Sequence, residues 1–194
     1  MNFYDKAIKS LKEKNYDDAA KNFFNHIYYN NSKGYPKSEN YSIIEDIEKI
    51  RYGTKEYYFN IINVPSYGDE IKAYSYAKLG IIYFYIDNKN FIEYFNKVYL
   101  LSKDYYLLNL IGIVFLKNGK YDMAIKFLEK SKELSNYLVS GVLYNLHTAY
   151  LMNYECDKAT YYLNEVKKLD NKLYIEEENM INDTKLRYAR LLNV

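Results

Sequence analysis

The sequence predicts an all-α fold, an array of about five antiparallel helical hairpins followed by a C-terminal capping helix. Apolar residues recur at spacings of three and four residues, which places them on one face of a helix. Small residues occupy equivalent places in several paired segments, and these places recur about every 35 residues. Gly and Pro are scarce, at 7 and 2 residues, which argues against a β-sandwich with many turns.

The composition is that of a folded protein with nearly balanced charge. The 194 residues are 49% hydrophobic and 27% charged, whereas a disordered chain has fewer apolar residues and a larger net charge. Lys+Arg total 27 and Asp+Glu total 25, and the resulting net charge of +2 argues against a nucleic-acid partner. Tyr is abundant, at 27 residues, which reflects either a genome rich in A and T or an aromatic binding surface.

No segment indicates secretion or a membrane span. The first ten residues carry charges and lack the apolar core of a secretory signal. The most apolar run, residues 107–116, is too short to cross a bilayer. Cys156 is the only cysteine, which excludes an intramolecular disulfide and suits a reducing compartment. We therefore expect a cytoplasmic protein without membrane insertion.

The first hairpin is expected over residues 1–30. Its first helix carries an apolar face at helical spacing, and after a polar turn Ala20 follows Ile8 by twelve residues. Residues 30–38 are rich in Asn, Ser, Gly and Pro, which predicts a loop.

The second hairpin is expected over residues 39–64. Two apolar-periodic stretches, Glu39–Tyr52 and Lys55–Val64, are separated by Gly53-Thr54, which we interpret as the turn between two short helices. Ala20 and Ala124 are 104 residues apart, about three periods of 35, so two hairpins should lie between the first hairpin and the one that contains Ala124. Residues 39–64 form one of them, a hairpin that fits the repeat pattern poorly.

Two further hairpins are expected over residues 70–102 and 105–136. Gly80 and Gly112 stand at the same place in the two first helices, where a small residue lets two helices approach closely. Ala124 follows Gly112 by twelve residues on the second helix. The earlier of the two hairpins has a shorter turn and no Ala at that place, which puts close packing there in doubt.

The last hairpin is expected over residues 140–169, and a capping helix over residues 172–192. Ala159 follows His147 by twelve residues and follows Ala124 by 35. The final segment mixes apolar residues with many charges, as suits the solvated helix that closes the end of a repeat array.

The stretch Leu108–Ser131 resembles the tetratricopeptide repeat. In that family the first helix carries an aromatic residue or Leu, then Leu-Gly, then Tyr, and the second carries Ala, a large apolar residue and a small one. The residues that carry the resemblance are Leu108, Ile111, Gly112, Phe115, Ala124, Leu128 and Ser131. The resemblance implies one domain over residues 1–194, a right-handed α-solenoid that holds a protein or peptide in its concave groove.

In this family the groove is lined by first-helix residues that do not pack on the hairpin partner. Their offset from Gly112 assigns to it Ala77, Ile81, Phe84, Tyr85, Asn109, Ile113, Leu116, Lys117, Tyr144, Thr148, Leu151 and Met152. Such an aromatic-aliphatic groove suits an amphipathic helix or an extended peptide with apolar anchors. The alternative is that the capping helix or neighbouring hairpins cover these side chains.

Residues for catalysis or metal binding are few. His26 and His147 lie in or beside apolar helical stripes, with no other ligand at metal spacing, so we interpret both as structural. Cys156 is flanked by acidic residues that oppose activation of its thiol. Glu176-Glu177-Glu178 is interpreted as a solvated face near a helix start. We therefore expect no enzymatic activity, metal or cofactor.

Three functional hypotheses follow. The first is an interaction scaffold that binds a protein or peptide through shape and apolar complementarity. The second is a peptide-sensing regulatory domain similar to those of bacterial pheromone receptors, although no helix-turn-helix precedes the repeats. The third is a helical-repeat protein that binds single-stranded RNA, against which the balanced charge argues. Self-association as a homo-oligomer through the Tyr-rich faces is compatible with all three.

Overall fold

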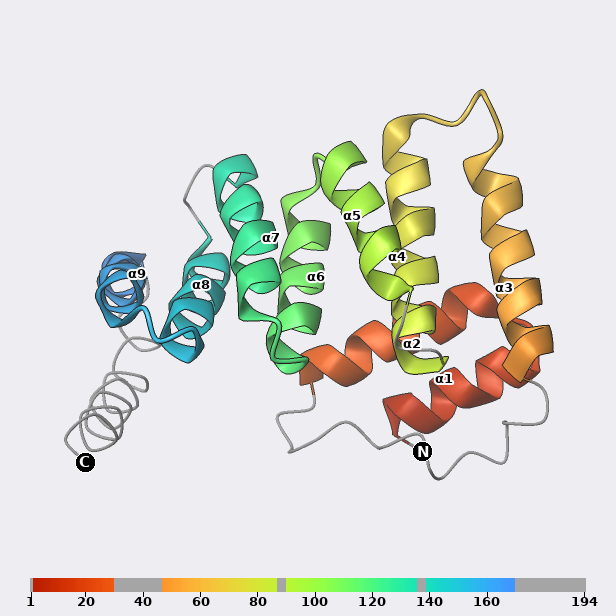
Figure 1. Ribbon diagram of the computed structural model, residues 1–194, viewed down its shortest axis with the longest axis horizontal. Coiled ribbons are helices and arrows are strands. Elements are labelled where there is room, and N and C mark those ends of the chain that lie inside the picture. Colours follow the sequence, from red (N-terminus) through yellow and green to blue (C-terminus); the bar gives the residue numbers. More distant parts are fainter. Residues whose placement is uncertain (1, 30–46, 87–89, 136–138, 170–194) are drawn as a thin grey trace. The chain divides into compact units, whose positions relative to one another are not determined.

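The described part of the chain is all-helical, as predicted. The structure, a computed structural model, describes residues 2–29, 47–86, 90–135 and 139–169, and within these ranges it has nine helices and no strand (Figure 1). The chain divides into two compact units, Met1–Lys103 and Asp104–Val194. The predicted loop at 30–38 and the predicted capping helix at 172–192 lie outside the described residues.

The first unit begins with the predicted helix pair, α1 (Phe3–Lys12) and α2 (Tyr16–Tyr29), which pack against each other. The side chain of Asn2 caps α1 by accepting a hydrogen bond from the backbone N–H of Asp5 at 2.8 Å. Ala7 and Leu11 lie one helical turn apart on the buried face of α1. The predicted apolar stripe therefore forms the inner side of this pair.

The next helix, α3 (Ile47–Ile62), is one continuous helix, so the predicted break at Gly53-Thr54 is wrong. Gly53 serves close packing instead of a turn, since a Cβ atom there would collide with the hydroxyl of Tyr16. Gly inside a helix costs about 1 kcal/mol relative to Ala, and in return the missing Cβ leaves room for the hydroxyl of Tyr16. The remainder of the predicted first helix, residues 39–46, lies outside the described residues.

The first unit ends with α4 (Asp69–Ile86) and α5 (Phe91–Leu101), close to the predicted bounds. The two helices pack against each other, and α4 also contacts α2 and α3. The carboxylate of Glu70, at the start of α4, accepts a hydrogen bond of 2.6 Å from the backbone N–H of Lys103. This bond holds the start of α4 beside the chain that follows α5. Most of the predicted turn, residues 87–89, lies outside the described residues.

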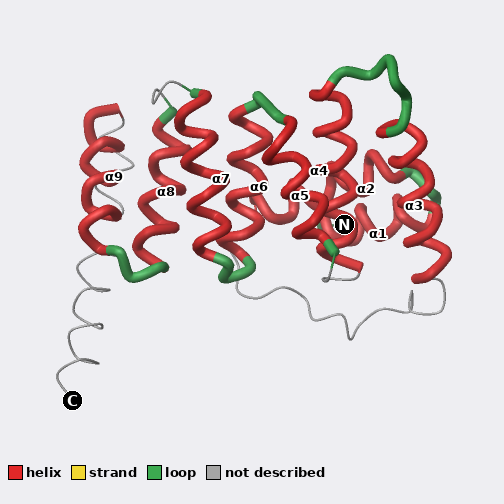
Figure 2. Tube along the Cα trace, turned by 45° about the horizontal axis from the view of Figure 1, so that its top comes forward, coloured by secondary structure: helices red, strands yellow, loops and turns green. Residues whose placement is uncertain are grey.

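The second unit contains four helices within its described residues: α6 (Tyr105–Lys117), α7 (Tyr121–Leu134), α8 (Ser140–Met152) and α9 (Cys156–Leu169). The pairs α6–α7 and α8–α9 run side by side, and α7 also packs against α8 (Figure 2). Asp104 caps α6, because its carboxylate accepts hydrogen bonds from the backbone N–H groups of Tyr106 and Leu107. All four helices fall within the predicted segments.

One turn geometry recurs at three helix connections. Lys14, Gly119 and Tyr154 have positive φ angles of 58°, 70° and 62°. In each turn the next backbone N–H donates to a carbonyl five positions back, from Asn15 to Ser10 at 2.8 Å, from Lys120 to Phe115 at 3.0 Å and from Glu155 to Tyr150 at 2.9 Å. This is the Schellman motif of helix C-termini. Positions 119 and 154 differ by 35, and positions 14 and 119 by 105, three times 35.

The recurring turn corrects the register of the first helix pair. In the two later turns an Ala follows the positive-φ residue by five positions, and the small-residue slot precedes it by seven. The corresponding residues of the first pair are Ala19 and Ala7, one position before the predicted Ala20 and Ile8. Ala7 and Ala19 are fully buried, whereas Ile8 is only half-buried. The predicted register was wrong by one residue because Ala19 and Ala20 fit the helical spacing equally well.

The small-residue slots at Gly80 and Gly112 have similar surroundings. A Cβ atom on Gly80 would lie 2.6 Å from the ring of Phe95 on α5, and one on Gly112 would lie 2.6 Å from Cγ of Leu128 on α7. Each glycine therefore allows close contact between the two helices of its pair. The third slot holds His147, which is fully buried, with Nδ1 3.1 Å from the carbonyl oxygen of Ala159.

Candidate binding surface

The predicted groove residues of the second unit come from α6 and α8, which contact each other. The side-chain amide of Asn145 on α8 donates a hydrogen bond of 2.9 Å to the side-chain oxygen of Asn109 on α6. Asn109, Ile113 and Leu151 are buried and form the base of this surface. The residues that remain accessible, here named the α6–α8 face, are Leu116, Lys117, Tyr144, Thr148 and Met152.

The α6–α8 face combines apolar side chains with one cation. Tyr144, Thr148 and Met152 are four residues apart, so they share one side of α8. Met152 is 45% exposed, and Lys117 is exposed at the end of α6. The hydroxyl of Thr148 donates to the backbone carbonyl of Tyr144 at 3.0 Å, which leaves its methyl group to contribute to the surface. This surface offers apolar contact area beside a positive charge.

The predicted groove residues of the first unit lie in a different environment. Ala77, Ile81 and Phe84 on α4 are buried. Tyr85 is half-buried and stacks on Phe23 of α2, with ring centroids 4.3 Å apart and ring planes 13° apart. Because α2 packs against α4, this part of the predicted groove is covered by the chain itself, as the alternative interpretation allowed.

A carboxylate cluster joins α2, α3 and α4 in the first unit. The carboxylate of Asp17 accepts hydrogen bonds from the hydroxyls of Tyr57 at 3.1 Å and Tyr58 at 3.0 Å. Nζ of Lys78 lies 2.8 Å from the same carboxylate. Partial burial pushes the pKa of Asp17 upward, but the hydrogen bonds and the charge of Lys78 outweigh it and hold the pKa below its ordinary value. The cluster therefore favours the ionised form of Asp17.

A similar cluster joins α7, α8 and α9 in the second unit. The carboxylate of Glu129 accepts hydrogen bonds from the hydroxyls of Tyr150 at 3.0 Å and Tyr162 at 2.6 Å, and it pairs with Lys132. The rings of the two tyrosines are stacked, with centroids 5.5 Å apart and planes 6° apart. Burial acts to raise the pKa of Glu129, but Lys132 and the tyrosine hydroxyls lower it further than burial raises it. Sequence reasoning missed both clusters, since their members are distant in the chain.

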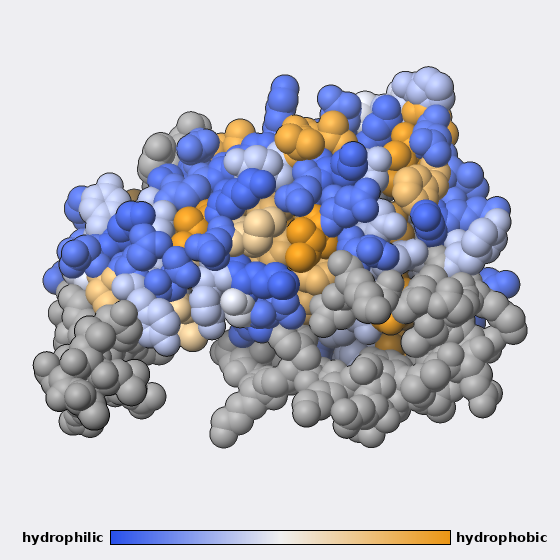
Figure 3. Space-filling model, in the orientation of Figure 1, coloured by the Kyte–Doolittle hydropathy of each residue, from blue (hydrophilic) through white to orange (hydrophobic). Residues whose placement is uncertain are grey.

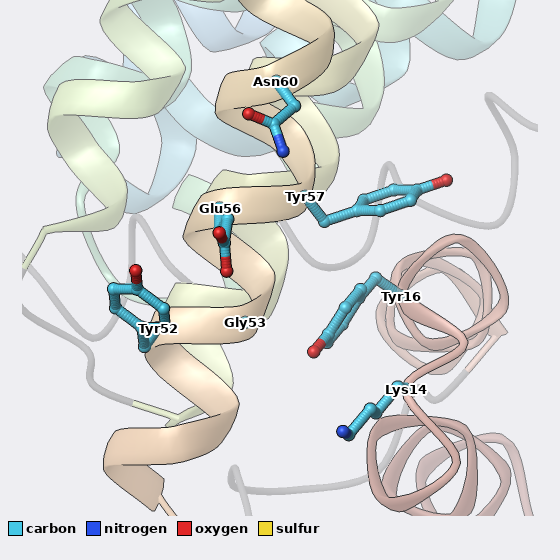
Figure 4. Close-up of a pocket in the computed structure, with 7 residues that line it drawn as sticks. All are labelled: Lys14, Tyr16, Tyr52, Gly53, Glu56, Tyr57 and Asn60. Carbon is cyan, nitrogen blue, oxygen red and sulfur yellow. The ribbon is translucent and has the colours of Figure 1, made fainter.

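An open groove of about 810 Å³ lies in the first unit between α3 and the turn before α2. Tyr16 projects from the start of α2 toward Gly53, and Tyr57 lies beside it, with ring centroids 5.5 Å apart (Figure 4). The residues that line the groove are Lys14, Tyr16, Tyr52, Gly53, Glu56, Tyr57 and Asn60. The signal for this groove was Gly53, whose place in an apolar segment was interpreted as a helix break.

Both histidines lie beside predicted groove residues, and the ring centroid of His147 is 6.1 Å from that of Tyr144. The ring of half-buried His26 contacts those of Tyr4 and Tyr85, with centroids at 5.3 and 6.0 Å, and burial lowers the pKa of His26. Cys156 is half-buried at the first residue of α9. Among the described residues, no group of three or more His, Cys, Asp or Glu side chains could hold a metal ion. The predicted Glu176-Glu177-Glu178 face lies outside the described residues.

Hydrophobic side chains on the face seen in Figure 3 form small groups among hydrophilic ones. In the part of the chain that the structure describes, every helix is too short or too polar to span a membrane. Comparison with models of known protein families, with curated proteins and with solved structures gives no match for this chain.

Proposed function

We propose that this chain is a non-catalytic scaffold that binds a protein or peptide, built as a right-handed α-solenoid similar to tetratricopeptide domains. The recurring turn at positions 14, 119 and 154 supports the repeat architecture, as do the matched surroundings of Gly80 and Gly112. A unit of two helices cannot bury its apolar face alone and needs neighbours, which leaves an extended surface for a partner.

The α6–α8 face is the observation that carries this proposal. Two neighbouring first helices contribute accessible apolar side chains there, above a base fixed by the hydrogen bond between Asn145 and Asn109. Tyr144 and Met152 would act as apolar anchor points for a partner. Lys117 at the end of α6 would pair with a carboxylate. The preferred partner is therefore a peptide segment with two apolar side chains and an acidic residue.

The proposal is tested by selecting a phage-displayed random peptide library on the full chain. We expect enriched peptides that combine aromatic or aliphatic anchors with an acidic residue. The double variant Tyr144→Ala, Met152→Ala should bind them at least about tenfold more weakly, because two anchors of about 1–2 kcal/mol are removed. The matched control is Tyr161→Ala, which removes a tyrosine that is 58% exposed on α9 and should leave binding unchanged.

Two results would contradict the proposal. The first is that the enriched peptides bind the double variant and the natural chain equally. The second is that no peptide is enriched while labelled single-stranded RNA binds in a salt-dependent manner, which would indicate the nucleic-acid hypothesis. Tight binding of a short free peptide in calorimetry, without any larger protein partner, would favour the peptide-sensing hypothesis over the scaffold.

A further inference from the structure

The contact between α2 and α4 in the first unit is a second candidate for partner recognition. It goes beyond the proposed function, because it concerns another surface in the other unit. α2 lies beside α4 (Figure 1), and its Phe23 stacks on Tyr85, one of the α4 residues that were predicted to line the groove. Two sets of contacts hold it there, a polar set around Asp17 and an aromatic set around Phe23.

The polar contacts are partly open to water. The side chains of Lys78 and Asp17, joined at 2.8 Å, are 36% and 46% exposed. Tyr57, which donates a hydrogen bond to Asp17, is 40% exposed. Because water reaches Lys78, Asp17 and Tyr57, these three groups can exchange their partners for water or for an equivalent carboxylate without leaving a buried unpaired charge. The other donor to Asp17, the hydroxyl of Tyr58, is fully buried and needs a carboxylate from the occupant of the groove.

The aromatic contacts supply the buried anchor. Phe23 is fully buried and stacks on Tyr85 of α4 at 4.3 Å. Tyr4 of α1 contacts the ring of Tyr85 edge-on, with centroids 5.8 Å apart. Aromatic pairs of this kind contribute beyond the area that they bury, and they are typical of recognition surfaces.

The residues of α2 that make these contacts form one helical stripe. Asp17, Ala20 and Phe23 are three residues apart in succession, so they lie along one side of the helix. Ala20, between Asp17 and Phe23 in this series, is fully buried. Each residue of the stripe has a counterpart in the surface opposite. The carboxylate of Asp17 meets Lys78 and two tyrosine hydroxyls, and the ring of Phe23 meets the ring of Tyr85. The small side chain of Ala20 allows the helices to pack closely.

We propose that α3 and α4 form a helix-binding groove that α2 occupies as a displaceable internal ligand. The external ligand is an amphipathic helix of a partner protein with the same stripe: an acidic residue, a small residue three positions on and an aromatic residue three further. Interfaces that are polar and aromatic are typical of reversible contacts between parts of one chain. The α1–α2 pair has its own turn and its own buried residues, such as Ala7 and Leu11, which hold it together when it leaves the groove.

The test adds a fluorescent peptide with the sequence of residues 16–29 to the full chain and measures binding by anisotropy. Helix α2 of the chain competes with the peptide for the groove. The apparent affinity for the peptide therefore equals the affinity of the open groove multiplied by the fraction of chains whose groove is open. Asp17→Asn in the chain weakens the internal copy and should tighten peptide binding about tenfold. Asp18→Asn is the matched control, since Asp18 pairs with Asn15 in its own turn and should not alter binding.

Groove variants complete the design. Adding Lys78→Ala and Tyr85→Ala to the Asp17→Asn chain should weaken peptide binding at least about tenfold, since the lysine and the aromatic platform are lost. If Asp17→Asn fails to fold by circular dichroism, Phe23→Leu replaces it, because it removes the stacking on Tyr85 and keeps most of the volume.

Three results would overturn this inference. The first is that the peptide binds the Asp17→Asn and Asp18→Asn chains equally, and the second is that it binds no chain at all. The third is that the Asp17→Asn chain dimerises in light scattering without binding peptide, which would make a second copy of the chain the occupant. None of these results bears on the α6–α8 face, so the proposed function can stand if this inference fails.

Discussion

Replacing Gly112 by Ala tests the close packing of α6 on α7. The added Cβ would lie 2.6 Å from Cγ and 2.7 Å from Cδ2 of Leu128, well inside the usual carbon–carbon contact distance of about 3.5 Å. Leu128 is fully buried, so it cannot turn aside into solvent. Either the helices separate or Leu128 leaves its preferred rotamer.

Two opposing effects set the size of the change. Ala gains about 1 kcal/mol over Gly inside a helix, whereas overpacking a well-packed core costs about 1–3 kcal/mol. We therefore expect Gly112→Ala to lower the free energy of unfolding by about 1 kcal/mol. Leu128→Ala alone lowers it by about 2–5 kcal/mol, because it leaves a cavity. In the Leu128→Ala background the obstacle is gone, so Gly112→Ala should raise the free energy of unfolding by about 1 kcal/mol.

The assay is urea unfolding of the four chains of this cycle, followed by circular dichroism. Gly141→Ala is the control, because Gly141 lies in α8 with nothing within 4 Å of the added Cβ. Because Gly141 is the second residue of α8, the gain there is smaller than in a helix interior, and the variant should leave stability unchanged or raise it slightly. The packing explanation is wrong if Gly112→Ala has the same sign in both backgrounds, or if it stabilises the natural chain.

Three further predictions concern the other structural features. Gly53→Ala should destabilise the first unit by about 1 kcal/mol in urea unfolding, and Tyr16→Phe should relieve this loss, because it removes the hydroxyl that lies against Gly53. Glu129→Gln should lower the free energy of unfolding by about 1–3 kcal/mol, while the exposed control Glu133→Gln should change it little. The lowered pKa of Asp17 means that its contribution to stability is present above the unfolded value of 3.8 and is lost as the pH falls through the folded pKa; Asp17→Asn should therefore flatten the acid limb of a stability–pH curve.

The sequence predicted the helices well wherever a small residue and an apolar stripe occurred together. The bounds of α6 and α7 follow from Gly112, Ala124 and the polar turn between them, since a turn with Gly at positive φ is a local signal. Lys14 and Tyr154 adopt the same left-handed conformation without being glycine, so their residue types do not indicate that conformation. That conformation identifies the repeat register, and only the structure could correct Ala20 to Ala19.

The candidate surfaces were less predictable, because burial depends on long-range packing. Tyr85 and Met152 were assigned to the same groove by offset, yet Tyr85 stacks on Phe23 and Met152 is 45% exposed. Nothing in the spacing of α4 indicates that a helix more than fifty positions earlier would cover it. Gly53 shows the opposite error, since a residue that usually interrupts a helix lies inside α3, against the hydroxyl of Tyr16.

The two carboxylate clusters explain how helices with apolar faces take one position along their neighbours. Ala, Leu and Ile stripes can slide by one turn at little cost, because their neighbours one turn away are also apolar. Asp17 and Glu129 each accept two tyrosine hydroxyls and pair with a lysine, and each joins three helices. A slide by one turn, about 5.4 Å, would break the bonds that cross between helices and leave Asp17 without its partners and Glu129 with only Lys132 of its own helix. Apolar burial therefore supplies most of the stability, while the carboxylates determine which residues meet.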